Sequence, residues 1–248
     1  MSALVLALAA GAVIGLALGA LGGGGSVLAV PALIYLLDFP PVAAATASLV
    51  IVTLTSVTAL SSHARDGNVR WRTGLLFAAA GIGPAMLGGA LAGRMPEGAL
   101  TAAFAVVAAV AAVRMMRARP PADTLVPVRP GRAAAAGAGL GAVTGFLGVG
   151  GGFLAVPALV GVLGVRMRKA VGTSLLVITV NSLAALAARA GTLDGLDWAV
   201  VGPFVGAAIL GAWDGKRLAA KVSGRMLQRI FALVLLAVAA FMLIDTVL

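Results

Sequence analysis

Two glycine-rich tracts are the part of this chain best suited to hold a ligand. Each interrupts an apolar stretch and is followed by the same hexapeptide, Leu-Ala-Val-Pro-Ala-Leu, at Leu28–Leu33 and at Leu154–Leu159. A short helix that starts at such a break has free backbone N–H groups and a positive dipole end, and both favour an anion. The predicted contacts of this anion are Gly23, Gly24, Gly25, Ser26 and Val27 in the first tract, and Gly150, Gly151, Gly152 and Phe153 in the second.

Glycine also permits tight turns and close helix packing, so each tract has a purely structural explanation as well. For any single glycine the two explanations are equally good, whereas the pairing of the tracts favours function. The runs Gly11-Gly15-Gly19 and Gly137-Gly141-Gly145 are different, because their four-residue spacing favours helix packing over a role in ligand binding. Nucleotide binding is not expected, since neither tract continues as Gly-Lys-Ser/Thr.

A span rich in small hydroxyl residues follows each tract. When the chain is shifted by 126 residues against itself, three of these residues match identically: Ser48 with Ser174, Thr53 with Thr179, and Ser56 with Ser182. At about 100° per residue the three positions share one helix face, which could line a polar path. Hydrogen bonding between helices is the alternative, and the sequence does not separate the two. Asn181, beside this row, is more strongly expected to be functional.

Ionisable residues offer little further chemistry inside the predicted spans. His63 and Arg189 lie at span ends and are weaker candidates for gating or coupling. Every Asp and Glu is predicted to lie in a loop, at a span edge or at the C-terminus, so no proton-relay carboxylate is expected. We therefore expect the membrane potential or the protonation of a substrate, ahead of His63, to drive any transport. The chain has no cysteine, and neither a metal site nor a cofactor is predicted.

The composition places these elements in a membrane. The chain is 61% hydrophobic and 10% charged, with a mean hydropathy of +1.11, far above the usage of soluble domains. We predict an all-α, polytopic membrane protein, and we assign the net charge of +10 to loops between spans and not to a nucleic-acid partner. The first stretch lacks a basic leader, so it is expected to be mature structure. The apolar stretches are 3–21, 42–62, 74–93, 98–116, 133–148, 170–188, 199–213 and 230–247.

The chain is duplicated. Residues 15–56 and 141–182 share 18 identities in 42 positions, which is a strong internal repeat. We predict a first membrane repeat at 1–116, a Pro- and Arg-rich cytoplasmic linker at 117–132, and a second repeat at 133–248.

The short apolar segments decide the predicted topology. Residues 26–37 and 153–163 are too short to span a bilayer alone, so 3–37 and 133–163 are interpreted as re-entrant helical hairpins, each followed by three full spans. The second repeat is then inverted, and 16 of the 18 Lys and Arg residues lie on one side. A model without hairpins would divide them evenly, so the positive-inside rule favours inverted repeats with both termini outside.

The duplicated Gly-x-Gly-Gly-x-x-Leu-x-x-Pro element, each copy followed by a Ser/Thr span, resembles the TauE/SafE sulfite exporter family over essentially the whole chain. The resemblance implies transport of a small sulfur-containing anion, such as sulfite, sulfoacetate or another organosulfonate, across the bacterial cytoplasmic (inner) membrane. Some members of the family act on thiosulfate through cysteines, and that branch is not expected here because cysteine is absent.

These observations predict a secondary transporter that works by alternating access and holds its anion at the two glycine breaks. Its expected partners are the small anion and the lipid bilayer, and a homodimer is left open. Alternatives are a transporter of the same fold for a carboxylate, or a non-transporting membrane scaffold. A metal substrate is disfavoured because acidic ligands are missing, and an enzyme because the spans lack a nucleophile, a base or a metal cluster.

Overall fold

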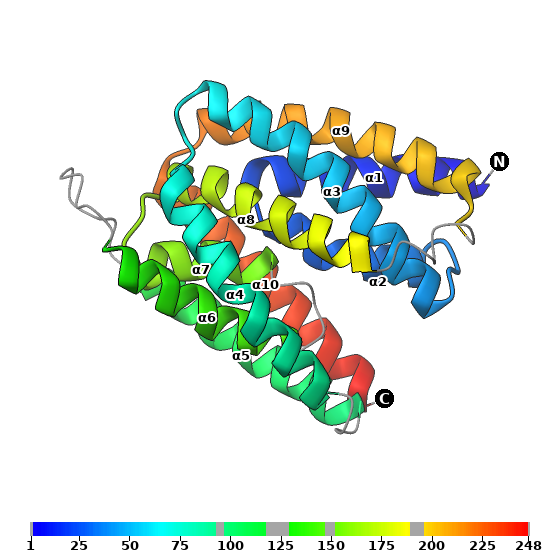
Figure 1. Ribbon diagram of the computed structural model, residues 1–248. Coiled ribbons are helices and arrows are strands. Elements are labelled where there is room, and N and C mark those ends of the chain that lie inside the picture. The colour runs from blue at the N-terminus through cyan, green and yellow to red at the C-terminus, as the bar shows by residue number, and fades with distance from the viewer. Residues whose placement is uncertain (1, 93–96, 118–128, 147–151, 189–195, 248) are drawn as a thin grey trace.

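The computed structural model describes residues 2–92, 97–117, 129–146, 152–188 and 196–247, and in these ranges the chain forms ten helices and no strand (Figure 1). The all-helical fold class is therefore confirmed. The helices are α1 (Ser2–Leu21), α2 (Gly24–Tyr35), α3 (Pro41–Arg65), α4 (Trp71–Ala92), α5 (Glu97–Arg117), α6 (Pro130–Phe146), α7 (Gly152–Gly161), α8 (Met167–Ala188), α9 (Trp198–Lys221) and α10 (Gly224–Val247).

Several of these helices are long and apolar enough to cross a membrane. Within the described part of the chain, five candidate spans occur in α1, α3, α8, α9 and α10. The helices α4 and α5 have 22 and 21 residues, which at about 1.5 Å per residue also reach across a hydrocarbon core. In contrast, α2 has 12 residues and α7 has 10. The chain is thus a polytopic membrane protein that combines full-length helices with two short ones.

The first glycine break makes a helical hairpin. The helix α1 ends at Leu21, Gly22 adopts a left-handed backbone with φ of +72°, and α2 begins at Gly24. Glycine adopts a left-handed backbone without the strain that most other residues meet there, so Gly22 suits this turn. The first turn of α2 then packs back on α1, because a Cβ added to Gly25 would lie 2.6 Å from the carbonyl oxygen of Ile14. In the second half, the segment between α6 and α7 lies outside the described residues.

The two halves of the chain pack across each other. The helix α1 runs along α9, and α4 runs along α6, so the first helix of each half lies beside the fourth helix of the other half (Figure 1). In addition, α3 contacts α8 and α5 contacts α10. Neither half therefore forms a separate bundle.

Glycine stripes make the crossing contacts close. A Cβ at Gly15 would lie 1.9 Å from the carbonyl oxygen of Ala208 in α9, and a Cβ at Gly141 would lie 2.1 Å from that of Gly81 in α4. The other stripe residues, Gly11, Gly19, Gly137 and Gly145, meet backbone carbonyls in the same way. The packing role predicted for these stripes is confirmed.

Both chain ends lie at one end of the bundle, at the right of Figure 1, whereas the turns from α3 to α4 and from α9 to α10 lie at the left. Basic side chains at this second end hold helix termini. Arg132 donates to the carbonyl oxygen of Val162 at 3.1 Å, and Arg168 donates to that of Ala220 at 2.9 Å. The side of the bilayer on which each end lies, the inversion of the repeats and the predicted domain division stay predictions.

We predict that Gly15→Ala loosens the contact between α1 and α9, because its methyl group would overlap the Ala208 carbonyl. The free energy of unfolding should fall by about 1–3 kcal/mol, the usual range for overpacking, as measured by thermal unfolding in detergent. Gly206→Ala in α9 is the matched control, since a Cβ there meets nothing within 4 Å. Equal loss in both variants would contradict the proposed contact.

Candidate functional site

The two glycine breaks meet each other. A Cβ added to Gly23 would lie 2.1 Å from the carbonyl oxygen of Gly152 and 2.8 Å from the Cα of Phe153. Because α2 begins at Gly24 and α7 at Gly152, the starts of both short helices lie together, one from each half of the chain. Only residues without a side chain permit this approach of backbone to backbone.

The structure describes most of the residues predicted at the breaks. Gly24, Gly25, Ser26 and Val27 form the first turn of α2, whereas Gly150 and Gly151 lie outside the described residues. Phe153 is fully buried, and its ring packs on that of Phe104 in α5 with 5.0 Å between centroids. Its side chain therefore belongs to the core, and only its backbone remains suited to contact an anion.

The first break also touches the hydroxyl row of the second half. A Cβ at Gly22 would lie 2.4 Å from Oγ of Ser174 in α8. Gly22 was not among the predicted site residues, although its match with Gly148 in the repeat pointed to it. The break of one half and the hydroxyl row of the other half thus form a single region.

The hydroxyl rows lie on two helices that contact each other, α3 and α8. All six matched residues are buried, and Oγ1 of Thr179 lies within hydrogen-bond distance of Oγ of Ser56, 3.0 Å away, which joins the two rows. Most of these hydroxyls also donate to a carbonyl of their own helix: Ser48 to Ala45, Ser56 to Thr53, Ser174 to Val171, Thr179 to Leu175 and Ser182 to Ile178. The structural explanation therefore accounts for five of the six hydroxyls.

Two polar groups in this region remain unsatisfied. Oγ1 of Thr53 and Oδ1 of Asn181 are buried and have no hydrogen-bond partner among the described residues. The side chain of Thr53 is only 5% exposed, and an unsatisfied buried polar group costs about 1–3 kcal/mol. Such a group needs an explanation, and a bound ligand supplies one. Rotation of the Asn181 amide would present its NH₂, which is a donor.

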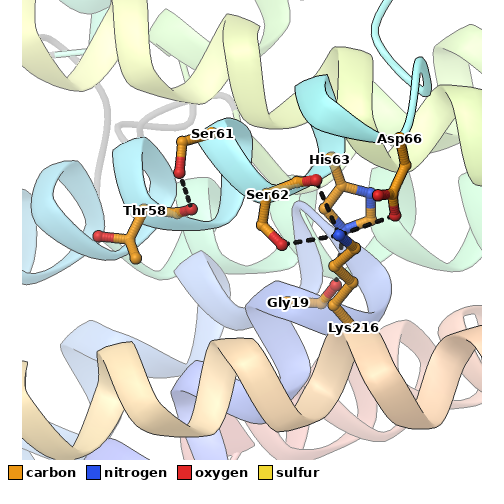
Figure 2. Close-up of polar contacts among 7 residues, drawn as sticks. All are labelled: Gly19, Thr58, Ser61, Ser62, His63, Asp66 and Lys216. Atoms are coloured by element: carbon orange, nitrogen blue, oxygen red, sulfur yellow. Dashed lines mark hydrogen bonds and ion pairs between the residues drawn. The ribbon is translucent and has the colours of Figure 1, made fainter.

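A second polar cluster lies at the end of α3, where sequence reasoning identified only His63. His63 is buried, and its Nε2 lies 3.2 Å from the carbonyl oxygen of Gly19 in α1. Lys216 of α9 reaches the same helix end (Figure 2). Its Nζ lies 2.7 Å from the carbonyl oxygen of Ser62, from Oγ of Ser62 and from Oδ2 of Asp66.

This cluster, which we call the Lys216 latch (Ser62, Asp66 and Lys216), joins the second half of the chain to the first. The hydrogen bond that Lys216 donates lowers the pKa of the Asp66 carboxyl group below its ordinary value of 3.8. No pattern in the sequence pairs a lysine of α9 with the end of α3, because the two residues lie far apart in the chain. Arg189, the other gating candidate, lies outside the described residues.

The comparisons with known proteins agree with this architecture. The family model described as "Sulfite exporter TauE/SafE" matches residues 7–242. The chain belongs to the TauE/SafE family. Two proteins of Xylella fastidiosa, from strains 9a5c and Temecula1, are each 33% identical over 97% of this chain and 95% of their own length. Both are described as "Probable membrane transporter protein". No solved structure matches the chain. This TauE/SafE protein is therefore a membrane transporter.

The pKa of Asp66 leads to a prediction for pH dependence. Because the folded-state pKa lies below the unfolded one, the latch stabilises the fold fully above the unfolded pKa and is lost as the pH falls through the folded pKa. We expect the melting temperature in detergent to fall as the pH is lowered below about 4. Lys216→Met should remove this acid step in the melting temperature. The free energy involved should stay below about 1 kcal/mol, because Asp66 is half exposed.

Asp214→Asn is the matched control for the latch. Asp214 pairs with Arg217 at 3.6 Å on an exposed surface, so its loss should leave the acid step of the melting temperature in place. An acid step of the same size in Lys216→Met would contradict the assignment to the latch.

Proposed function

We propose that this TauE/SafE protein moves a small sulfur-containing anion, such as sulfite, sulfoacetate or another organosulfonate, across the bacterial cytoplasmic membrane by alternating access. The observation that carries the proposal is the contact between Gly23 and Gly152. It supports a shared site in which helix starts from both halves face one ligand, the arrangement typical of secondary transporters.

The chemistry of the region suits an oxoanion. The first turns of α2 and α7 offer backbone N–H groups and positive dipole ends, and the hydroxyl of Thr53 offers one more donor. Among the described residues, the buried polar side chains are hydroxyls, one histidine and one glutamine, with no buried carboxylate. An anion at this place would meet donors without a competing negative charge.

Alternating access fits the way in which the halves interlock. The glycine backbones of the two breaks are in contact in this structure, so an anion between them requires the breaks to separate. The helix pairs α1–α9 and α4–α6 each join both halves, and we propose that these tightly packed pairs move as units. The interface between α3 and α8, which is lined by hydroxyls, would then open and close.

A carboxylate is the second candidate substrate, because helix starts and hydroxyls bind any small oxoanion. Counterflow of labelled sulfite into proteoliposomes separates the candidates. We expect exchange of sulfite, competition by sulfoacetate and weaker competition by acetate. Gly23→Ala should abolish exchange, because its methyl group overlaps the Gly152 carbonyl, whereas Gly206→Ala should retain it. Equal competition by acetate would favour the carboxylate, and no exchange of any anion would favour a scaffold.

Thr53→Val tests the unsatisfied hydroxyl directly. The substitution removes a buried polar group without a partner, so a merely structural role predicts unchanged or higher thermal stability. A ligand role predicts, in addition, a loss of sulfite exchange of about tenfold or more, the value of one hydrogen bond to a charged group.

Thr55→Val is its matched control in the same helix. The hydroxyl of Thr55 is buried but donates to the carbonyl oxygen of Ile51 at 2.6 Å. This variant should keep its exchange rate. Normal exchange in Thr53→Val would remove this hydroxyl from the site.

A further inference from the structure

A groove of about 420 Å³ lies between α5, α6 and α7, and neither glycine tract is among its lining residues. Its walls are apolar. On α5 the lining residues Val106, Val110 and Arg114 recur every four positions and so share one face. Val106 and Val110 are exposed, which places this face toward lipid. Arg114, near the end of α5, is the only charged residue among those that line the groove.

The groove is open because two glycines line it. A Cβ at Gly139 of α6, or at Gly161 of α7, would meet nothing within 4 Å. Neither glycine is therefore explained by helix packing, unlike those of the α1 and α6 stripes. The space that Gly139 and Gly161 leave lies along the apolar wall of the groove, and this wall ends at Arg114.

Positive charge gathers at this end of the groove. Arg114 is exposed and forms no ion pair with any described residue. Arg132 lies at the same end, since it donates to the carbonyl oxygen of Val162, which lines the groove. The positive-inside rule predicts that this is the cytoplasmic end. The groove is thus apolar along its length and positively charged at its mouth, the end at which Arg114 and Arg132 lie.

The first half of the chain has no equivalent of this mouth. With an offset of 126, Gly161 corresponds to Tyr35 and Gly139 to Val13. In the last helix of each half the buried residues Phe104 and Phe231 align at an offset of 127, which makes Phe241 the counterpart of Arg114. Tyr35 and Phe241 pack edge to face, with 5.9 Å between ring centroids. An aromatic pair therefore occupies the positions that correspond to Gly161 and Arg114, at which the groove is open and charged.

We propose that the groove binds one anionic phospholipid, with an acyl chain along α5, α6 and α7 and the phosphate at Arg114. A guanidinium pairs well with phosphate oxygens, and basic pockets between helices on the cytoplasmic side are suited to lipid headgroups. Leu154 and Pro157 of α7 line the groove. The bound chain would thus lie against the helix whose first turn forms the second glycine break.

Native mass spectrometry of the purified full chain in detergent tests this site. We expect dioleoyl phosphatidylglycerol to be retained, dioleoyl phosphatidylcholine to be retained poorly, and glycerol 3-phosphate not to compete. Arg114→Ala should weaken binding of phosphatidylglycerol about tenfold, as expected for one charge-assisted hydrogen bond. Gly139→Leu should abolish it by filling the groove. Arg117→Ala, one turn along α5 and outside the groove lining, is the matched control and should bind normally.

Three outcomes would overturn the proposal. Equal retention of both lipids would show that the charge at the mouth selects nothing, and competition by glycerol 3-phosphate would assign the site to a free phosphate. Conversion of a dimer to a monomer by Gly139→Leu would show that a second copy covers the groove. Arg114→Ala keeps the test valid if Gly139→Leu does not fold, because Arg114 is an exposed side chain whose replacement leaves the apolar lining residues in place.

Discussion

Contact between backbones, made possible by glycine, organises this protein. In a bilayer the apolar side chains gain nothing by leaving lipid for one another, so helices associate through close packing and polar contacts. Here the stripes on α1 and α6 bring those helices against carbonyl groups of α9 and α4. The same principle places Gly23 of one break against Gly152 of the other. Close contact between backbones at glycine therefore builds both the helix scaffold and the candidate site.

Where glycine backbones meet in this way, backbone amides are the main polar groups available at the candidate site. A side chain at Gly23 would separate the two short helices, and a carboxylate nearby would repel an anion. The described core instead holds hydroxyls, most of which are satisfied within their own helices. Thr53 has no partner, whereas Thr179, the same residue type at the matching position of the repeat, donates to the carbonyl oxygen of Leu175, so the surroundings of each hydroxyl and not its residue type decide whether it is satisfied.

The sequence alone was enough to predict the helical class, the duplication and the hairpin at Gly22, because composition, identity at a fixed offset and element length are local or periodic signals. The packing stripes were predicted for the same reason. Contacts between distant residues were not. The approach of Lys216 to Asp66, and of Gly22 to Ser174, depends on how α9 and α8 cross α3 and the first break. The groove at Gly139 was missed because an open glycine and a packed glycine look the same in a sequence.

The Lys216 latch has a consequence for the energetics of a protein with two related halves. At offsets of 126 and 127, the counterparts of Lys216 are Ala90 and Gly89, so no lysine can close the opposite end in the same way. If the interface between α3 and α8 opens alternately to the two faces as proposed, the two faces would differ in opening energy by roughly the value of one partly exposed ion pair, up to about 1 kcal/mol. That difference shifts the ratio of the two conformers several-fold. Under that proposal the duplication would supply two near-equal states, and the single amine of Lys216 would bias the balance between them.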